Sequence, residues 1–197
     1  IVWMFSAGRP VHAPALATDE AVFFPCDNGF LFKLDRKTGK EVWRYDLGDA
    51  QSSRVLIHPE TEDFDWDLYG PRPMLLDGVL DVGAGDGGFH GVDAATGTRK
   101  WRFETKGKIR GEAFAHGDNV VFGSFDMHVY AVDRQTGKEV WKKMTGGPIS
   151  TSAGLVGDKV VVGNRGSALV ALDPTSGEKL WLNMFWGSAV ESAPVPY

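Results

Sequence analysis

Short runs of apolar residues alternate with turn-forming residues along the chain, and the pattern repeats at intervals of about 40 residues. In the third repeat, apolar-rich segments at 109–115, 119–123, 128–132 and 138–144 are separated by breaks that contain Gly or Asp. Segments of this length and spacing are typical of β-strands. The run Val-Val-Phe at 120–122 is apolar on both faces, which is typical of a strand covered on both sides. No sufficiently long window has helical periodicity, so the pattern predicts repeated four-stranded sheets with essentially no helix.

A nine-residue phrase that begins with Asp and ends with Trp occurs four times, at 35–43, 93–101, 133–141 and 173–181. Trp3 stands where the end of an earlier copy would fall. The tryptophans recur at equal steps, except that the step from Trp43 to Trp101 is longer because it carries an insertion. Equal steps of about 40 residues are typical of repeat architectures such as propellers.

The residue types within the phrase have a structural explanation. The Asp carboxylate can accept hydrogen bonds from backbone N–H groups two and three residues on, the Thr hydroxyl can join them, and Gly supplies the positive φ of the turn. The Trp is expected on the outermost strand, where its ring covers the neighbouring unit, and the strict spacing favours this role over stacking on a base or a sugar. The residues assigned to docking are Trp3, Asp35, Gly39, Trp43, Asp93, Gly97, Trp101, Asp133, Gly137, Trp141, Asp173, Gly177 and Trp181.

The phrase at 131–141, Ala-Val-Asp-x-x-Thr-Gly-Lys-x-x-Trp, resembles the tryptophan-docking motif of the PQQ-like, or quinoprotein-alcohol-dehydrogenase-like, β-propellers. The resemblance covers all four units, and it implies an all-β propeller, most often of the bacterial periplasm or cell envelope. Members range from quinone-dependent dehydrogenases to non-enzymatic scaffolds, such as the lipoprotein that assists outer-membrane barrel assembly. The motif is therefore specific for the fold and much weaker for function.

The whole chain, 1–197, is expected to be a single β-propeller segment of four complete four-stranded blades with partial blades at both ends. By resemblance it is a fragment of a propeller with seven or eight blades; the alternative is a natural half-propeller that dimerises. An open arc exposes strand edges and two apolar blade faces, so remaining blades or a second copy are expected as partners. The expected boundaries are 9–46, 49–104 with an insertion at 49–70, 108–144 and 147–184, with partial blades at 1–5 and 189–197.

Composition and charge exclude several classes of function. A formal net charge of −5 predicts no nucleic-acid partner. No apolar run is long enough for a transmembrane helix. The single cysteine, Cys26, excludes an internal disulfide and a cysteine-based metal cluster. It also excludes the vicinal disulfide on which, by resemblance, the dehydrogenases stack their quinone. PQQ with Ca²⁺ is therefore implied by the resemblance alone.

Aligning the repeats places variable polar positions on the innermost strands, which line the central channel of a propeller. One interpretation is that these side chains contact a ligand or a protein. The other is that they only solvate the channel mouth and pair with each other, for instance Arg72 with Glu112. The candidate channel residues are His12, Arg72, Arg110, Glu112, Ser152 and Glu191.

The insertion at 49–70 is expected to cross one rim of the disc beside the channel, where long loops often carry function. Its run at 63–67 alternates acidic and aromatic residues, and Trp186 should reach the same rim. The carboxylates suit Ca²⁺ by type but lack the spacing of a calcium loop. A merely solvated loop is equally compatible with the sequence. The candidate rim contacts are Asp65, Trp66, Asp67 and Trp186.

These observations favour a non-catalytic binding or assembly scaffold of the bacterial cell envelope that contacts a protein partner or a small ligand through one rim and the channel mouth. The alternative is part of a PQQ-dependent sugar or alcohol dehydrogenase. A third possibility is a repeat module with no ligand, in which substitution of Arg72, Arg110 and Glu112 alters nothing measurable.

Overall fold

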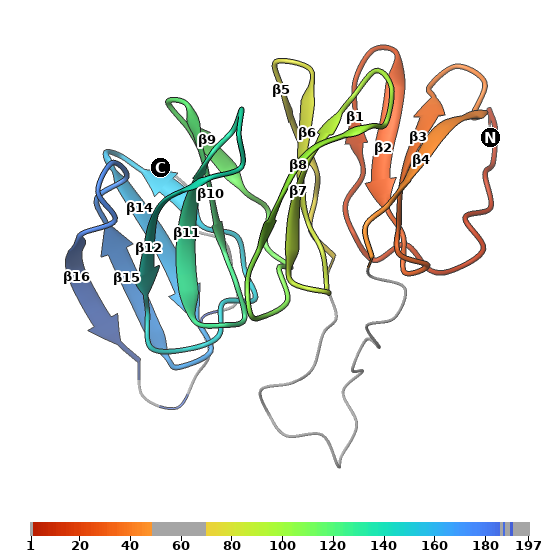
Figure 1. Ribbon diagram of the computed structural model, residues 1–197. Coiled ribbons are helices and arrows are strands. Elements are labelled where there is room, and N and C mark those ends of the chain that lie inside the picture. The colour runs from red at the N-terminus through yellow and green to blue at the C-terminus, as the bar shows by residue number, and fades with distance from the viewer. Residues whose placement is uncertain (1, 49–69, 186, 188–189, 191–197) are drawn as a thin grey trace.

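The computed structural model describes residues 2–48, 70–185, 187 and 190. These residues form four antiparallel, four-stranded sheets and no helix, so none of the described segments could cross the membrane as a helix. The sheets stand side by side in an open arc (Figure 1). The all-β propeller architecture expected from the sequence is confirmed.

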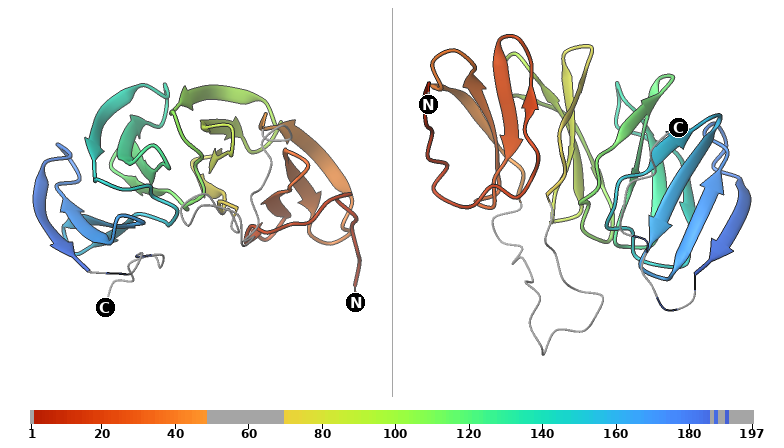
Figure 2. Two further views of the ribbon diagram at one scale, coloured as in Figure 1. Left: turned by 90° about the horizontal axis from the view of Figure 1, so that it is seen from below. Right: turned by 180° about the vertical axis from the view of Figure 1, so that it is seen from behind.

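Each sheet forms one blade whose strands pair in chain order from the inside of the arc to the outside, as Figure 2 shows. We number the blades 1 to 4 along the chain. Their strands are β1 (Leu16–Ala17), β2 (Ala21–Pro25), β3 (Phe30–Asp35) and β4 (Glu41–Asp46) in blade 1; β5 (Met74–Leu76), β6 (Val79–Gly83), β7 (Gly88–Asp93) and β8 (Arg99–Glu104) in blade 2; β9 (Phe114–His116), β10 (Asn119–Gly123), β11 (His128–Asp133) and β12 (Glu139–Met144) in blade 3; and β13 (Gly154–Val156), β14 (Lys159–Asn164), β15 (Ala168–Leu172) and β16 (Lys179–Met184) in blade 4.

The innermost strands are shorter than the sequence predicts. In blade 3 the predicted strand at 109–115 is a three-residue strand, β9, whose residues pair with the start of β10. The segment before β9 is held by the preceding blade instead, because the Ile109 N–H donates to the carbonyl of Ala84 at 3.0 Å. The Ile149 N–H donates to Ser124 of blade 3 in the same way, at 3.1 Å. These inner segments therefore join neighbouring blades.

The two rims of the arc carry different connections. The link after each outermost strand lies beside the turn between the second and third strands, since the Leu47 N–H donates to Gly29, Thr105 to Gly87 and Thr145 to Met127, at 2.8–2.9 Å. We call this the crossover rim, because the chain passes to the next blade there. The Asp-to-Gly turns of the docking phrase join the third and fourth strands at the opposite rim.

Apolar clusters fill the space between neighbouring blades, which explains why the middle strands are apolar on both faces. Between blades 2 and 3, the rings of Phe89 and Phe122 stack with centroids 3.9 Å apart and an interplanar angle of 8°. Between blades 1 and 2, Phe23 and Leu31 belong to the same cluster as Val82. Burial of such side chains contributes about 1.5–3 kcal/mol each relative to exposure.

The docking phrase forms the same turn four times. In blade 3, Asp133 Oδ1 accepts hydrogen bonds from the Gln135 N–H at 3.2 Å, the Thr136 N–H at 2.8 Å and the Thr136 hydroxyl at 2.6 Å. These bonds lower the pKa of Asp133, and equivalent bonds lower the pKa of the other three carboxylates of the phrase. The turn closes with a bond from the Gly137 N–H to the Asp133 carbonyl at 2.8 Å.

Four docking indoles each lie on the Gly of the next copy of the phrase: Trp3, Trp43, Trp101 and Trp141. A Cβ on Gly177 would lie 2.6 Å from Trp141 Cε3, so only glycine leaves room for the ring, and its φ of +70° is also the left-handed conformation that glycine favours. The ring nitrogen of Trp141 donates to the carbonyl of Pro174 at 3.1 Å. The same arrangement joins Trp3 to Arg36, Trp43 to Ala94 and Trp101 to Arg134, at 2.6–3.3 Å.

Candidate binding surface at the channel

Side chains from three successive blades meet along the inside of the arc. Arg72 Nη1 of blade 2 lies 3.5 Å from Glu112 Oε1 of blade 3, and the Glu112 N–H donates to Ser152 Oγ of blade 4 at 2.8 Å. The side chains of Arg72 and Glu112 are 42% and 40% exposed. We call these three residues the channel ladder. The pair of Arg72 and Glu112, which the sequence analysis gave as an example of channel side chains that only pair with each other, is present.

A close backbone contact sets the spacing of the ladder. A Cβ on Gly111 would overlap the backbone carbonyl of Thr151 in the next blade. Glycine at this position therefore lets the inner segments of blades 3 and 4 touch. This contact holds Glu112 and Ser152 at hydrogen-bond distance.

Two residues before Glu112 and Ser152, the side chains of Arg110 and Ser150 are covered, although this position was expected to line the channel. Arg110 is 4% exposed and Ser150 is 8% exposed. Ser150 Oγ accepts a hydrogen bond from Arg165 Nε at 3.1 Å, and the Arg165 guanidinium lies 4.9 Å from the centroid of the Phe125 ring. Arg110 is therefore not open to a partner, although Arg72 and Glu112 are.

The other candidate residues lie apart from the ladder or outside the described residues. His12 of blade 1 is exposed, and its Nδ1 lies 2.6 Å from Asp27 Oδ2. The expected contacts at Asp65, Trp66, Asp67, Trp186 and Glu191 fall outside the described residues.

A buried ion pair between blades 2 and 3 was missed by sequence reasoning. Arg134 Nε donates to Asp81 Oδ2 at 3.0 Å, and Arg134 Nη2 donates to the Leu76 carbonyl at 2.9 Å. Both side chains are almost completely buried. Burial raises the pKa of the Asp81 carboxyl to about 6, and the charge and hydrogen bond of Arg134 only partly oppose the rise. The one available signal was an Asp within a second strand that is otherwise apolar.

The raised pKa of Asp81 predicts a pH-dependent stability. The folded protein holds a proton on Asp81 between pH 4 and 6 that the unfolded chain, with a pKa of 3.8, has released. The free energy of unfolding should therefore fall by about 3 kcal/mol across this window as the pH rises. Urea unfolding at pH 4, 5, 6 and 7 measures it, comparing the wild type with Asp81→Asn, which should lack this component. Asp77→Asn, at an exposed carboxylate 3.5 Å from Arg134, is the control and should keep the wild-type slope. An unchanged slope in Asp81→Asn would contradict the prediction.

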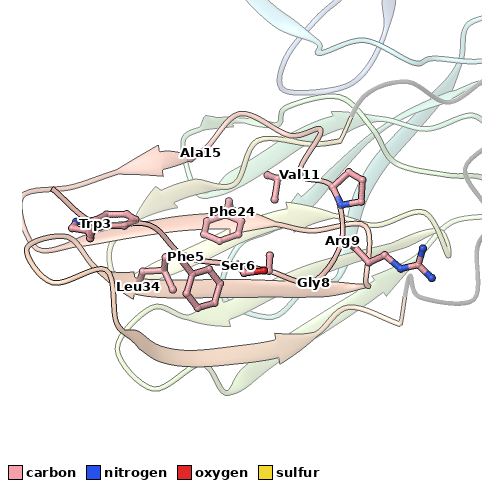
Figure 3. A pocket seen from close by; sticks show the side chains of 11 residues that line it. Trp3, Phe5, Ser6, Gly8, Arg9, Val11, Ala15, Phe24 and Leu34 are labelled. Atoms are coloured by element: carbon pink, nitrogen blue, oxygen red, sulfur yellow. The ribbon is translucent and has the colours of Figure 1, made fainter. Parts of the chain in front are cut away.

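A cavity of about 690 Å³ lies on the open face of blade 1 (Figure 3). Trp3 and Phe5 of the N-terminal segment line it together with Phe24 and Leu34 of the sheet. The Phe5 ring lies 6.3 Å from that of Phe24. The cavity therefore has an aromatic and aliphatic lining and sits where the other blades have a neighbour.

In the other blades, side chains of the preceding blade cover the face that corresponds to this cavity. In blade 2, the residues equivalent to Phe24 and Leu34 are Val82 and Val92, and both are completely buried. They belong to one cluster with Phe23 and Leu31, which come from the middle strands of blade 1. The cavity on blade 1 therefore has the form of a blade-to-blade interface.

The residues present do not fit a quinone site of the dehydrogenase type. Cys26 is buried, and its Sγ lies 3.4 Å from the carbonyl oxygen of Arg9 and 3.5 Å from that of Pro10. As the single cysteine of the chain, it cannot form a vicinal disulfide. Within the described residues, no three His, Cys, Asp or Glu side chains are grouped in a way that could hold a metal ion.

The repeats match a known family along the whole chain. A family model described as outer membrane protein assembly factor BamB, of the PQQ-like repeat type, matches residues 1–146 and 125–197. The chain belongs to this family. The resemblance of the docking phrase to the PQQ-like propellers is therefore confirmed. Among curated proteins, no sequence matches the chain significantly.

Solved structures show the same fold at low sequence identity. The crystal structure of BamB from Moraxella catarrhalis is similar with a TM-score of 0.76 and 22% identity, over 94% of this chain and 52% of that one. Quinohemoprotein alcohol dehydrogenase from Comamonas testosteroni is similar with a TM-score of 0.70 and 19% identity, over 89% of this chain and 35% of that one. Quinohemoprotein alcohol dehydrogenase ADHIIG from Pseudomonas putida HK5 has a TM-score of 0.71 and 20% identity, over 91% and 35%. The chain thus spans about half of the BamB chain and about a third of each dehydrogenase.

Proposed function

We propose that this BamB-family propeller segment is a non-catalytic assembly scaffold of the bacterial cell envelope. It contacts a protein partner through the channel mouth and the crossover rim. The observation that carries this proposal is the channel ladder, because it places exposed charges of both signs and a hydroxyl on a surface held by three blades. Such preformed polar groups on a rigid scaffold are typical of recognition surfaces.

Two further observations support a scaffold over a dehydrogenase. The BamB family model matches the chain along its whole length. The chain also spans 52% of the BamB structure, against 35% of each dehydrogenase structure. Cys26, as a single cysteine, does not fit the vicinal disulfide on which, by the family resemblance, quinone-dependent dehydrogenases stack their quinone. Envelope location is proposed because the matching family is that of the outer membrane protein assembly factor BamB.

Further blades are the proposed occupants of the open face of blade 1. A second copy would have to bring its own outermost strand to this face. Yet Trp3 already lies on Gly39 of blade 1, where the indole of such a strand would dock. A blade whose outermost strand is Val2–Phe5 fits the cavity, because Trp3 is then its own docking indole. The apolar lining at Phe24 and Leu34 matches the middle strands of such a blade.

Reversing one charge of the ladder should weaken partner contact without unfolding the protein. In Arg72→Glu two carboxylates face each other, so the complementary surface is lost. The pair is exposed, so the free energy of unfolding should change by no more than about 1 kcal/mol. A photoreactive amino acid in place of Ser152 measures contact in cells of the native host: it should form a protein adduct whose yield falls at least fivefold in Arg72→Glu.

The control for this experiment is the same photoreactive residue at Thr175, in the docking turn of blade 4 on the opposite rim. It should give no adduct of the same mass. An adduct that forms equally well with and without the Arg72→Glu substitution, or that forms only from Thr175, would contradict a partner at the channel mouth. Unchanged thermal unfolding of Arg72→Glu verifies that the fold is intact.

A further inference from the structure

The outermost strand of blade 4 has an unusual edge. β16 lies at the edge of its sheet, so one row of its backbone N–H and C=O groups has no strand partner within the described structure. Edge strands usually carry charged side chains that discourage pairing with another chain. β4, β8 and β12 carry three, four and three charged residues out of six, whereas β16 carries Lys179 alone. Of the four outer edge strands described, β16 is the least protected.

The same strand presents a continuous apolar stripe. Leu180, Leu182 and Met184 alternate along β16 and so project from one face of it. They are 46%, 40% and 53% exposed. We call these residues the β16 stripe. The equivalent positions of β8 are all charged: Lys100, Arg102 and Glu104.

A further blade after blade 4 would leave the stripe open. The equivalent residues in blades that do have a following neighbour remain exposed: Val42 is 53% exposed, Val140 is 48% and Met144 is 59%. The indole of each outermost strand, one residue away, is the side chain that meets the next blade. The exposure of the stripe therefore follows from its position on the outermost strand and does not depend on whether a further blade follows blade 4.

The neighbouring blade indicates the charge of an occupant. Between blades 2 and 3, Phe103 packs edge-on against Tyr130, with ring centroids 5.3 Å apart. The residues equivalent to this pair between blades 3 and 4 are Lys143 and Val170, and Val170 pairs in register with Leu182. Lys143 of blade 3 thus stands where blade 2 has the Phe103 ring, and it faces the side of blade 4 that carries the β16 stripe. A carboxylate on an occupant would be complementary to it.

We propose that the edge of β16 docks an extended segment of a protein partner as a fifth strand. The segment carries alternating apolar residues, which cover the β16 stripe, and an acidic residue, which pairs with Lys143. Backbone hydrogen bonds along an edge supply affinity in this mode, and the alternate side chains supply specificity. The surface is on the outer circumference, so it is separate from the channel ladder and independent of the function proposed there.

The test uses a fluorescein-labelled ten-residue peptide in which Val alternates with Thr and which carries one central Glu. Its binding to the purified chain is followed by fluorescence anisotropy. The wild type should bind it saturably. The triple variant Leu180→Lys, Leu182→Arg, Met184→Glu copies the residues that β8 carries naturally, and it should bind at least tenfold more weakly. Leu182→Arg alone, expected to weaken binding severalfold, serves if the triple variant does not fold.

Two controls distinguish strand pairing from general adhesion. Val42→Lys, at the equivalent position of β4, should bind the peptide as the wild type does. A peptide with N-methyl groups on alternate amides, which removes backbone donors, should not bind. The proposal is overturned if the wild type shows no saturable binding, or if the triple variant or the N-methylated peptide binds equally well. It is also overturned, in favour of a second copy as occupant, if the wild type sediments as a dimer that the triple variant loses and that the peptide does not disrupt.

Discussion

Replacing Trp141 by alanine should lower the free energy of unfolding by about 3–5 kcal/mol, the usual cost of truncating a buried aromatic side chain. The ring is 7% exposed and lies on Gly177 of the next blade. Truncation would also leave the Pro174 carbonyl without the hydrogen bond from the indole nitrogen. Chemical denaturation at pH 7 measures the loss. An unchanged slope against denaturant would show that the transition itself is intact.

Trp181→Ala is the matched control, because Trp181 ends the last copy of the phrase. It is more exposed than Trp141, and within the described residues no glycine of a following copy lies beneath it. Trp181→Ala should therefore lower the free energy of unfolding clearly less than Trp141→Ala does. Equal losses at the two positions would contradict the view that docking on the next blade, and not burial in the indole's own blade, gives these residues their role.

Gly111→Ala should lower the free energy of unfolding by about 3 kcal/mol, at the upper end for an overpacked site. The added Cβ meets the backbone carbonyl of Thr151, which cannot rotate away as a side chain could. The inner segments of blades 3 and 4 must then separate, and the bond from the Glu112 N–H to Ser152 Oγ should be lost with them. Denaturant unfolding gives the stability, and hydrogen exchange of the Glu112 amide reports the local change.

Gly117→Ala is the control for this substitution. Gly117 has a φ of +57° and open space around its Cβ position, so alanine there should cost about 1 kcal/mol for the left-handed backbone alone. The Glu112 amide should keep its protection in this variant. If Gly111→Ala costs no more than Gly117→Ala, the inner segments are not in the tight contact described here.

Sequence reasoning succeeded where the determining interactions are local or follow the repeat. The turn at Asp133 depends on groups two and three residues away, so its composition specifies it. Arg72 and Glu112 lie one full repeat apart in the chain, yet the repeat period alone places the two residues on neighbouring blades. Repetition thus made a long-range contact predictable.

Sequence reasoning failed where one blade differs from the others or where a segment bonds outside its own blade. The inner strands were predicted too long because Ile109 and Ile149 donate to the preceding blade, which no local pattern reveals. Arg110 was expected at the channel and is covered. The bond between Asp81 and Arg134 links residues 53 positions apart, and Asp81 has no acidic counterpart in the other repeats, where Phe23, Val121 and Val161 stand. A residue that departs from the repeat in a single blade gives no periodic signal. An Asp within an otherwise apolar strand does, however, indicate that a buried partner for its carboxylate is needed.

Dye reduction by the purified chain distinguishes a binding scaffold from a quinone-dependent dehydrogenase most directly. The protein is incubated with PQQ and Ca²⁺, a simple alcohol or an aldose is added, and reduction of an electron-accepting dye is followed by absorbance. A scaffold should give the rate of the same mixture without protein. A rate that rises in proportion to protein concentration and disappears after heat denaturation would contradict the account and favour the dehydrogenase.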